Sequence, residues 1–309
     1  METLKTIRDE VLGWIDEVGD TDTTADNVDA AIRQAHSQRV TQERWPFMLY
    51  PKQTFSLVAN QQLYSLHQQF HRPLYFFNQT HKKFLEQIPP RQLTDTDIDW
   101  IAGQNSNTFT LWGTQPVQAQ PTSASVVTIV STSASDNTAA KAVIVRGETT
   151  NGIETETITP NGLTGVAGTK SFSTILNVTL TANWAGTLTM TSNSAAVTNL
   201  KLVAGEKGRE YQQLRLLYLP SADTIEYQFF RKPSPLTNEN DILDIPYPHG
   251  KILVWDTLLL MAAYDNQVEG NRMGVWIDNQ KRMDTALRQA YLEPQSLKSR
   301  GRYVKYTGD

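Results

Sequence analysis

The sequence predicts an α+β protein in which a bundle of about four helices and a small antiparallel sheet are interrupted by an inserted all-β sandwich. Near both ends of the chain, apolar residues recur every three or four positions, which is typical of amphipathic helices. Between these regions lie short runs of strand-like alternation bounded by turn residues. From about Pro116 to Leu200 the composition changes to Thr, Ser, Ala, Val, Asn and Gly with very few charges, which indicates a separate module.

The length and composition allow this organisation. The chain has 309 residues, of which 39% are hydrophobic and 19% are charged, so it can build one large domain or two ordinary ones, each with its own core. We expect residues 1–116 to form the first part of the core domain, residues 117–200 the inserted β domain, and residues 201–309 the second part of the core domain.

Two helices are predicted at the N-terminus. The first runs from Leu4 to Val18, where apolar side chains recur at helical spacing, and Gly19 follows in the position of a left-handed cap. After the polar stretch DTDTTADN, a second helix is predicted through Val28 to Arg39, with acidic residues in its first turn. The two helices are expected to form a helical hairpin.

The next region has the pattern of short strands rich in Phe, Tyr and Leu. Before the insert these runs are WPFMLY, TFSLVANQQLYSL, RPLYFFNQ, KKFLEQIPP and NTFTLWG, and after it EYQQLRLLYLPSADTIEYQFFRKPSPL contains two more. Because the same composition resumes after the Thr-rich segment, that segment is predicted to be inserted into a loop of one domain.

The Thr-rich segment has its own strand and turn signals. AVIVRGETTNGIETETITP contains two alternating runs joined at Asn151-Gly152, a dipeptide preferred in tight hairpin turns. Asn161-Gly162 and the runs SFSTILNVTLT and GTLTMTSN continue the pattern at the strand spacing of a small sandwich. These features predict an immunoglobulin-like domain.

The stretch from Ile242 to Asp265, ILDIPYPHGKILVWDTLLLMAAYD, predicts the buried central helix of the core. Its residues after Gly250 are so apolar that little of the helix circumference can face water. The run of about thirteen residues is shorter than the roughly 20 that a bilayer requires. We therefore expect it to pack against neighbouring helices or neighbouring subunits, and Trp255 and Leu259 are the candidate subunit-interface residues.

A last amphipathic helix is predicted from about Gly274 to Leu292, and Pro294 would end it. The remaining segment is basic and interleaved with aromatic residues. It can be a solvated tail, an arm that orders on a partner surface, or a weak nucleic-acid contact, although four charges give only modest, salt-dependent affinity. Its candidate partner-binding residues are Lys298, Arg300, Arg302, Tyr303, Lys305 and Tyr306.

The sequence offers little for catalysis. The absence of cysteine excludes disulfides, Cys-ligated zinc, iron–sulfur clusters and thiol nucleophiles. There is no GxSxG, Walker or HExxH motif, so we predict no catalytic residues, no cofactor and no enzymatic activity. The net charge of -4 and pI near 5.8 argue against a broad basic surface for nucleic acid. The N-terminus lacks an uninterrupted apolar core, so we expect no secretory signal.

Two patterns resemble metal sites. His67 and His71 are four residues apart, which on a helix would place both rings on one face, but their segment is strand-like and has no third ligand. The sequence TDTDID alternates acids from Asp95 to Asp99 as a calcium loop does, but Trp100 stands where that loop requires glycine. We therefore predict no metal site.

The order of elements is itself distinctive. It comprises two N-terminal helices, a W-x-F strand (Trp45, Phe47), the strand TFSLVANQQLYSL, the hairpin YLPSADTIEYQFFRKP, and an I-P-x-P-x-x-x-x-x-x-W helix followed by a C-terminal helix. This order resembles the head–tail adaptor (connector) proteins of tailed bacteriophages, and the likeness is closest to those of short-tailed phages. It covers about residues 1–116 and 200–309, and the inserted domain departs from the smallest members.

The resemblance implies a structural virion protein at the head–tail junction, made in the bacterial host cytoplasm. It implies a ring of about twelve copies between the portal protein and the tail nozzle or tail tube. DNA would pass through the ring without specific binding, and no membrane would be involved. The basic C-terminal segment would be the arm that docks on the portal, and the insert could contact tail fibres or capsid.

A second hypothesis is a tail-associated protein that binds a receptor or carbohydrate through its β-sandwich, with the helices as its virion anchor. Deletion of about residues 117–200 would distinguish the two, because loss of host attachment with intact particles favours the second. A cell-wall hydrolase would need a pair of carboxylates in a cleft, and no such pair stands out in the sequence.

Overall fold

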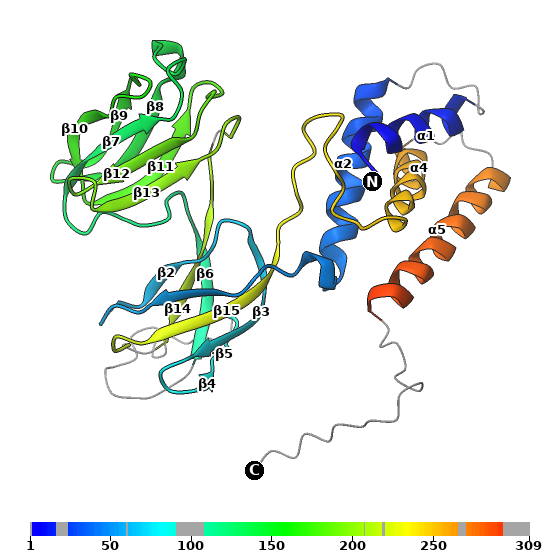
Figure 1. Cartoon of the computed structure of the whole chain (residues 1–309), viewed down its shortest axis with the longest axis horizontal. Helices are drawn as coiled ribbons and strands as arrows, with labels where there is room; N and C mark the ends of the chain where they lie inside the picture. Colours follow the sequence, from blue (N-terminus) through cyan, green and yellow to red (C-terminus); the bar gives the residue numbers. More distant parts are fainter. Residues whose placement is uncertain are drawn as a thin grey trace. The chain divides into compact units, whose positions relative to one another are not determined.

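The computed structural model describes residues 2–16, 24–59, 61–90, 108–206, 208–217, 220–264 and 270–292. The chain divides into two compact units (Figure 1). The helical unit combines residues 1–51 with residues 230–309, and the β unit consists of residues 52–229. Each unit therefore has its own core.

The predicted fold class is wrong in its balance of helix and strand. Within the described residues, fifteen strands form four sheets and there are only four α-helices, so the protein is mostly β. The predicted small antiparallel sheet is in fact two four-stranded sheets, one of which includes a parallel pair. Helical periodicity at the two chain ends was a correct local signal, but it accounts for only one of the two units.

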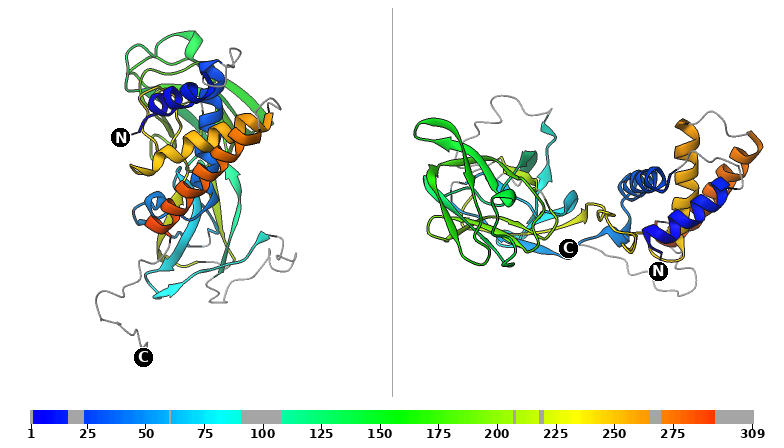
Figure 2. Two further views of the ribbon diagram at one scale, coloured as in Figure 1. Left: turned by 90° about the vertical axis from the view of Figure 1, so that its right-hand side faces the viewer. Right: turned by 90° about the horizontal axis from the view of Figure 1, so that it is seen from above.

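The helical unit is built around four helices, which Figure 2 shows grouped together. They are α1 (Leu4–Asp16), α2 (Ala25–Gln42), α4 (Ile252–Tyr264) and α5 (Gly270–Tyr291). The Thr24 hydroxyl caps α2 by accepting from the Asn27 backbone N–H. Helix α4 contacts each of the other three, and its Ile252, Leu253 and Leu258 are buried in the shared core. The predicted central helix therefore occupies the centre of this unit.

In the β unit, two sheets carry the aromatic strands. The first has the order β1-β15-β3-β4, with bounds Gln53–Ser56, Thr224–Arg231, Phe70–Asn78 and Lys83–Phe84. The second has the order β2-β14-β6-β5, with bounds Leu63–Ser65, Tyr211–Leu216, Thr108–Gln115 and Glu86–Gln87. The buried Phe76 ring lies 4.6 Å from that of Phe109 and 5.3 Å from that of Tyr227, so aromatic side chains fill the space between the sheets.

The Thr-rich segment forms the other two sheets. One has the order β10-β7-β12-β13, with bounds Val166–Phe172, Ser125–Ser131, Leu188–Ser192 and Val197–Leu202. The other has the order β11-β8-β9, with bounds Thr174–Leu180, Val143–Thr149 and Gly152–Ile158. Gly152 has a φ of +102°, which explains the need for glycine after Asn151 where β8 turns into β9.

A buried carboxylate joins the loops of this segment. Asp136 is fully buried and accepts hydrogen bonds from the Ser131 hydroxyl (2.6 Å), the Lys141 ammonium (2.7 Å) and the backbone N–H groups of Ala185 and Gly186 (both 2.9 Å). Burial alone would raise the pKa of Asp136, but these donors hold it well below its usual range. The carboxylate therefore stabilises the fold while ionised.

No helix in the described ranges combines the length and the apolar character needed to cross a membrane.

Candidate protein-interaction surface

The two subunit-interface candidates lie on α4 but have different surroundings. The Trp255 side chain is half-buried, and its ring lies 5.2 Å from the ring of Trp14 on α1. Much of its apolar surface is therefore covered by the N-terminal helix of the same chain. Leu259, one turn further along α4, is also half-buried, but it lines a pocket at the surface of the helical unit.

The pocket has a volume of about 300 Å³ and is formed by α2, α4 and α5. Its lining combines small and aliphatic side chains, glutamines and an ion pair. Its residues are Ala35, Gln38, Arg39, Gln42, Asp256, Leu259, Leu260, Ala263 and Gln280. We refer to it as the α2–α4–α5 pocket.

The ion pair centres on Arg39, which is only 7% exposed. Its guanidinium donates to both carboxylate oxygens of Asp256, at 2.8 and 2.6 Å, and to Asp284 of α5 at 2.5 Å. Burial alone would lower the pKa of Arg39, but the hydrogen bonds and charges of Asp256 and Asp284 raise it. A single cation thus ties three helices together in the wall of the pocket.

The network extends further along α5. Arg288 donates to Asp284 at 2.7 Å and to Glu43 at 2.9 Å, and Gln280 donates to Asp256 at 3.1 Å. The whole network contains two cations, Arg39 and Arg288, and three carboxylates, which belong to Asp256, Asp284 and Glu43. It therefore carries one net negative charge. Of these charged residues, Arg39 and Asp256 line the pocket, and they pair with each other.

The W-x-F motif positions the end of α5. Trp45 is fully buried, and its indole N–H donates to the Arg39 carbonyl at 2.9 Å. Its ring stacks on Phe47, which in turn meets the ring of Tyr291 edge-on at 5.2 Å. The end of α2 and the end of α5 are thereby fixed next to each other, so the chain leaves α5 from a defined place.

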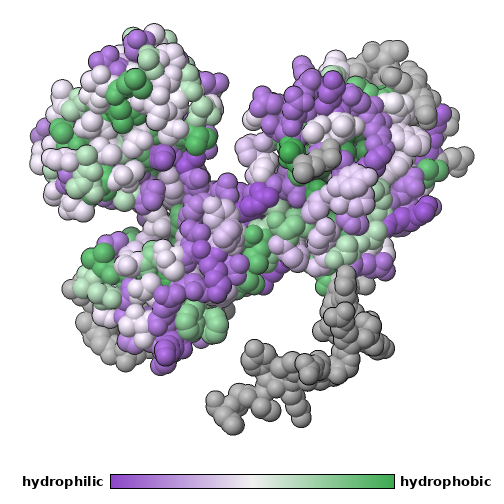
Figure 3. All heavy atoms as spheres, viewed as in Figure 1, coloured by the Kyte–Doolittle hydropathy of each residue, from purple (hydrophilic) through white to green (hydrophobic). Residues whose placement is uncertain are grey.

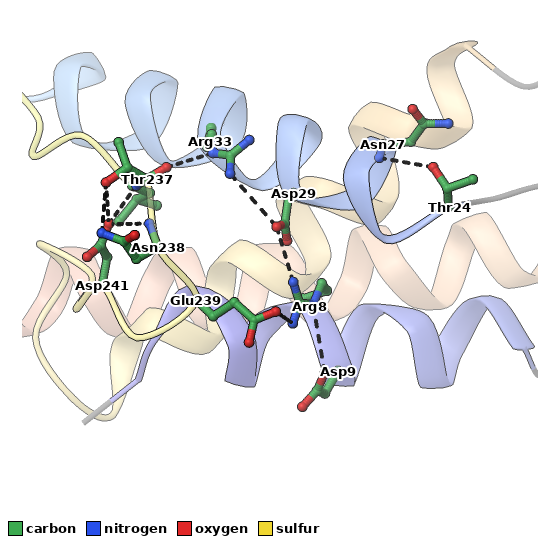
Figure 4. A network of polar contacts seen from close by, with 11 residues as sticks. Arg8, Asp9, Thr24, Asn27, Asp29, Arg33, Thr237, Asn238, Glu239 and Asp241 are labelled. Carbon is green, nitrogen blue, oxygen red and sulfur yellow. Dashed lines mark hydrogen bonds and ion pairs between the residues drawn. The ribbon is translucent and has the colours of Figure 1, made fainter. Parts of the chain in front are cut away.

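A second polar network holds the segment before α4 on the helices (Figure 4). Arg8 of α1 bridges Asp29 of α2 at 3.2 Å and Glu239 at 2.6 Å. Arg33 of α2 donates to the Leu236 carbonyl at 2.6 Å. These contacts hold the irregular segment between β15 and α4 in place. They also pair charged side chains that the sequence alone would assign to solvent.

His36 of α2 lies in the same region. It is buried, and its Nε2 accepts the Asp244 backbone N–H at 3.3 Å. Burial lowers its pKa, and the positive charge of Arg231 lowers it further, while the Asp244 carboxylate opposes them. The acceptor role of Nε2 requires the neutral ring.

The other residues singled out in the sequence do not form a site among the described residues. The arm residues Lys298 to Tyr306 and the acids Asp95 to Asp99 lie outside the described residues. His67 packs its ring 5.6 Å from that of Phe229 in the aromatic core, while His71 lies within β3. In the part of the chain that the structure describes, no three His, Asp or Glu side chains gather as a metal site would require.

Sequence reasoning missed the Arg39 network. Arg39 lies at the end of the predicted second helix, and Asp256 interrupts the apolar run of the central helix. A basic residue four positions after the apolar Ala35 and an acidic residue within the apolar run of the central helix are the signal that could have identified a buried pair, because an isolated buried charge is too costly. Asp284, the third residue of this network, could not be identified from the sequence in this way.

Comparison with known proteins supports a functional class. A search of curated proteins found no match. The model of one family, described as SU10 adaptor protein, matches residues 2–303 and so includes both units and the Thr-rich segment. That match supports a phage structural adaptor and a component of the virion. The chain belongs to the SU10 adaptor protein family.

Proposed function

We propose that this protein is a head–tail adaptor that forms a ring, of about twelve copies, between the portal and the tail and lines the conduit for DNA ejection. The observation that carries the proposal is the family match, which spans nearly the whole chain. The helical unit would make the ring contacts, and the protein would act by assembly, without catalysis.

Features of the helical unit support such contacts. Leu259, Leu260 and Ala263 leave apolar surface on α4 that the described residues do not fully cover. Figure 3 shows hydrophobic patches among a mostly hydrophilic surface on this unit. In a ring, identical neighbours can cover such surface through heterologous contacts that close. The net charge of -4 favours a channel through which DNA slides without being held.

The remaining parts of the chain receive roles in the same proposal. The segment from Lys298 to Tyr306 would be the arm that docks on the portal, and the opposite face of the ring would receive the tail nozzle or tail tube. Residues 117–200 would be an immunoglobulin-like domain on the outside of the ring. Two packed sheets around one core support that assignment, and capsid or tail fibres would be its partners.

The experiment is negative-stain imaging and native mass spectrometry of the full-length protein, alone and mixed with its portal protein. We expect closed rings and a portal complex. A protein that stays monomeric in the presence of portal would contradict the proposal. A full-length variant with Lys298, Arg300, Arg302 and Lys305 all changed to serine should form rings but lose portal binding, and retained binding would contradict the role of the arm.

A further inference from the structure

The β3–β4 hairpin carries three aromatic rings on the face of its sheet that points away from the core. Phe84 of β4 is 67% exposed, although phenylalanine is among the residue types most often buried. Its ring lies 5.0 Å from that of Phe77, which is directly opposite on β3, and 5.9 Å from that of Tyr75. The alternating residue Phe76 is buried in the aromatic core. We refer to Tyr75, Phe77 and Phe84 as the aromatic patch, and exposed rings of this kind mark protein contacts.

The backbone of Phe84 is open to an added strand. β4 is an edge strand of the sheet β1-β15-β3-β4 (Figure 1). The Leu85 N–H donates to the Phe76 carbonyl at 2.9 Å, so the neighbouring pair, Phe77 and Phe84, is one that does not exchange ladder hydrogen bonds. The N–H and C=O of Phe84 therefore point away from β3. No other described strand pairs with β4, so an extended chain can add to this edge.

The tip of the same hairpin is basic. Lys82 and Lys83 are exposed, and neither forms an ion pair with a described residue. Residues 78–85 contain no acid, and the next acid, Glu86, follows in β5 of the neighbouring sheet. On the face that carries the aromatic patch, the charge of Glu226 is already matched by Lys52 at 3.2 Å. The excess of positive charge at the hairpin favours an acidic occupant.

Hydrogen bonds from a buried side chain hold the turn of the hairpin. The Asn78 Oδ1 accepts the backbone N–H groups of Thr80 and His81, both at 3.0 Å, and its Nδ2 donates to Asp223 at 3.1 Å. Lys82 has a φ of +52°, which glycine or asparagine adopts more readily than lysine. A lysine kept in this conformation indicates a use for its charge, and a turn already held loses little freedom on binding.

From these observations we propose that the edge of the β3–β4 hairpin binds an extended acidic segment of a partner protein. The segment would add to β4 in the antiparallel direction of the other pairs in this sheet, with an apolar residue opposite Phe84. Its side chain would lie on the aromatic patch, and flanking carboxylates would meet Lys82 and Lys83. A single-stranded nucleic acid could use the lysines and rings, but it has no peptide groups for the strand edge. The contact requires neither the ring nor the portal.

The probe is the synthetic peptide acetyl-Glu-Asp-Leu-Asp-Glu-amide, titrated against the full-length protein at low salt and followed by saturation-transfer difference NMR. In the proposed register the leucine N–H points at the Phe84 carbonyl, whereas the N–H of the following aspartate points to solvent. N-methylation of the leucine should therefore weaken binding about tenfold, because it removes a ladder hydrogen bond. N-methylation of that aspartate is the matched control and should leave the affinity unchanged. A peptide with lysines in place of the acids should not bind.

Variants of the protein test the same contact from the other side. Phe84→Ser should weaken the peptide about tenfold, because the leucine loses its apolar contact. Lys82→Asn with Lys83→Ser should weaken it about fivefold, and asparagine suits the positive φ at residue 82. In 1 M NaCl, where the Debye length is about 3 Å, the wild type should bind as this variant does. Lys201→Ser with Lys281→Ser removes two exposed lysines elsewhere and should change nothing.

The proposal is overturned if the acidic peptide does not bind or if the lysine peptide binds equally well. Equal effects of the two N-methyl groups would exclude strand addition. Tighter binding of a single-stranded oligothymidine than of the peptide would assign the surface to nucleic acid instead. If Phe84→Ser does not fold, as judged by circular dichroism, the lysine variant and the peptide series still decide. Ring formation and portal binding are measured separately, so a failure here is distinguishable from a failure of the proposed function.

Discussion

Replacement of Arg39 by methionine tests how the helical unit is held together. Methionine keeps an unbranched stem of similar length but removes the cation that lies between Asp256 and Asp284. The side chains of these two acids are 12% and 22% exposed, so both carboxylates would remain largely shielded from water with no guanidinium between them. The variant therefore measures the cost, in free energy of unfolding, of removing the cation that these shielded carboxylates share.

The expected loss is about 3 kcal/mol of unfolding free energy. Removing one partner of a buried ion pair typically costs about 3–5 kcal/mol. The low end applies because Asp284 keeps Arg288 at 2.7 Å and Asp256 keeps Gln280 at 3.1 Å. Since a domain is stable by only about 5–15 kcal/mol, the loss would be a large fraction of the total.

Urea unfolding followed by circular dichroism at 222 nm is the suitable assay, because the described α-helices all lie in the helical unit. Arg288→Met is the matched control. Its side chain is 35% exposed, so its loss should cost about 1 kcal/mol or less. Adding Asp256→Asn to Arg39→Met should recover part of the loss, as coupled neighbours do. Equal losses for Arg39→Met and Arg288→Met would refute the reasoning.

Three further variants test other parts of the structure by thermal unfolding. Gly147→Ala should cost about 1–3 kcal/mol, because the added Cβ would collide with the backbone carbonyl oxygen of Thr174, whereas Gly274→Ala, which meets nothing within 4 Å, should be tolerated. Asp136→Asn should cost about 2–3 kcal/mol, and because the pKa of Asp136 is lowered in the fold, the stabilisation that it supplies should be fully present above pH 3.8 and lost progressively as the pH falls below that value toward the folded pKa. His36 has a folded pKa below 6.5, so the wild-type helical unit should lose stability as the pH falls below 6.5, and His36→Gln should not show that loss.

Local features of the helices could be predicted from the sequence. The central helix was expected where α4 lies, because its apolar residues leave no polar face. The last helix was expected from about Gly274 to Leu292, and α5 spans Gly270–Tyr291. Boundaries shifted by a few residues because helix ends depend on capping contacts, which a sequence pattern does not specify.

The fold class could not be predicted because sheet formation depends on distant partners. Strand β1 pairs with β15, so that Gln53 lies opposite Tyr227, and β5 and β4 contribute only two residues each. Short strands of this kind carry no periodic signal of their own. Their sheets are specified by long-range packing of aromatic rings such as Phe76 and Phe109.

Long-range packing also limited what the sequence could predict about the interaction surface. The sequence showed that α4 had more apolar surface than a small core requires, but it left open whether the N-terminal hairpin or a neighbouring subunit covers it. The structure brings Trp14 against Trp255 within one chain and leaves Leu259 beside a pocket. Trp255 and Leu259 stay predictions as subunit contacts.

The most direct test of the account is the native mass of the full-length protein in complex with its portal protein. A ring adaptor predicts a single assembly that contains a closed set of identical chains bound to the portal, and imaging of the same sample should show a central channel. A monomer that binds portal weakly or not at all would contradict the account.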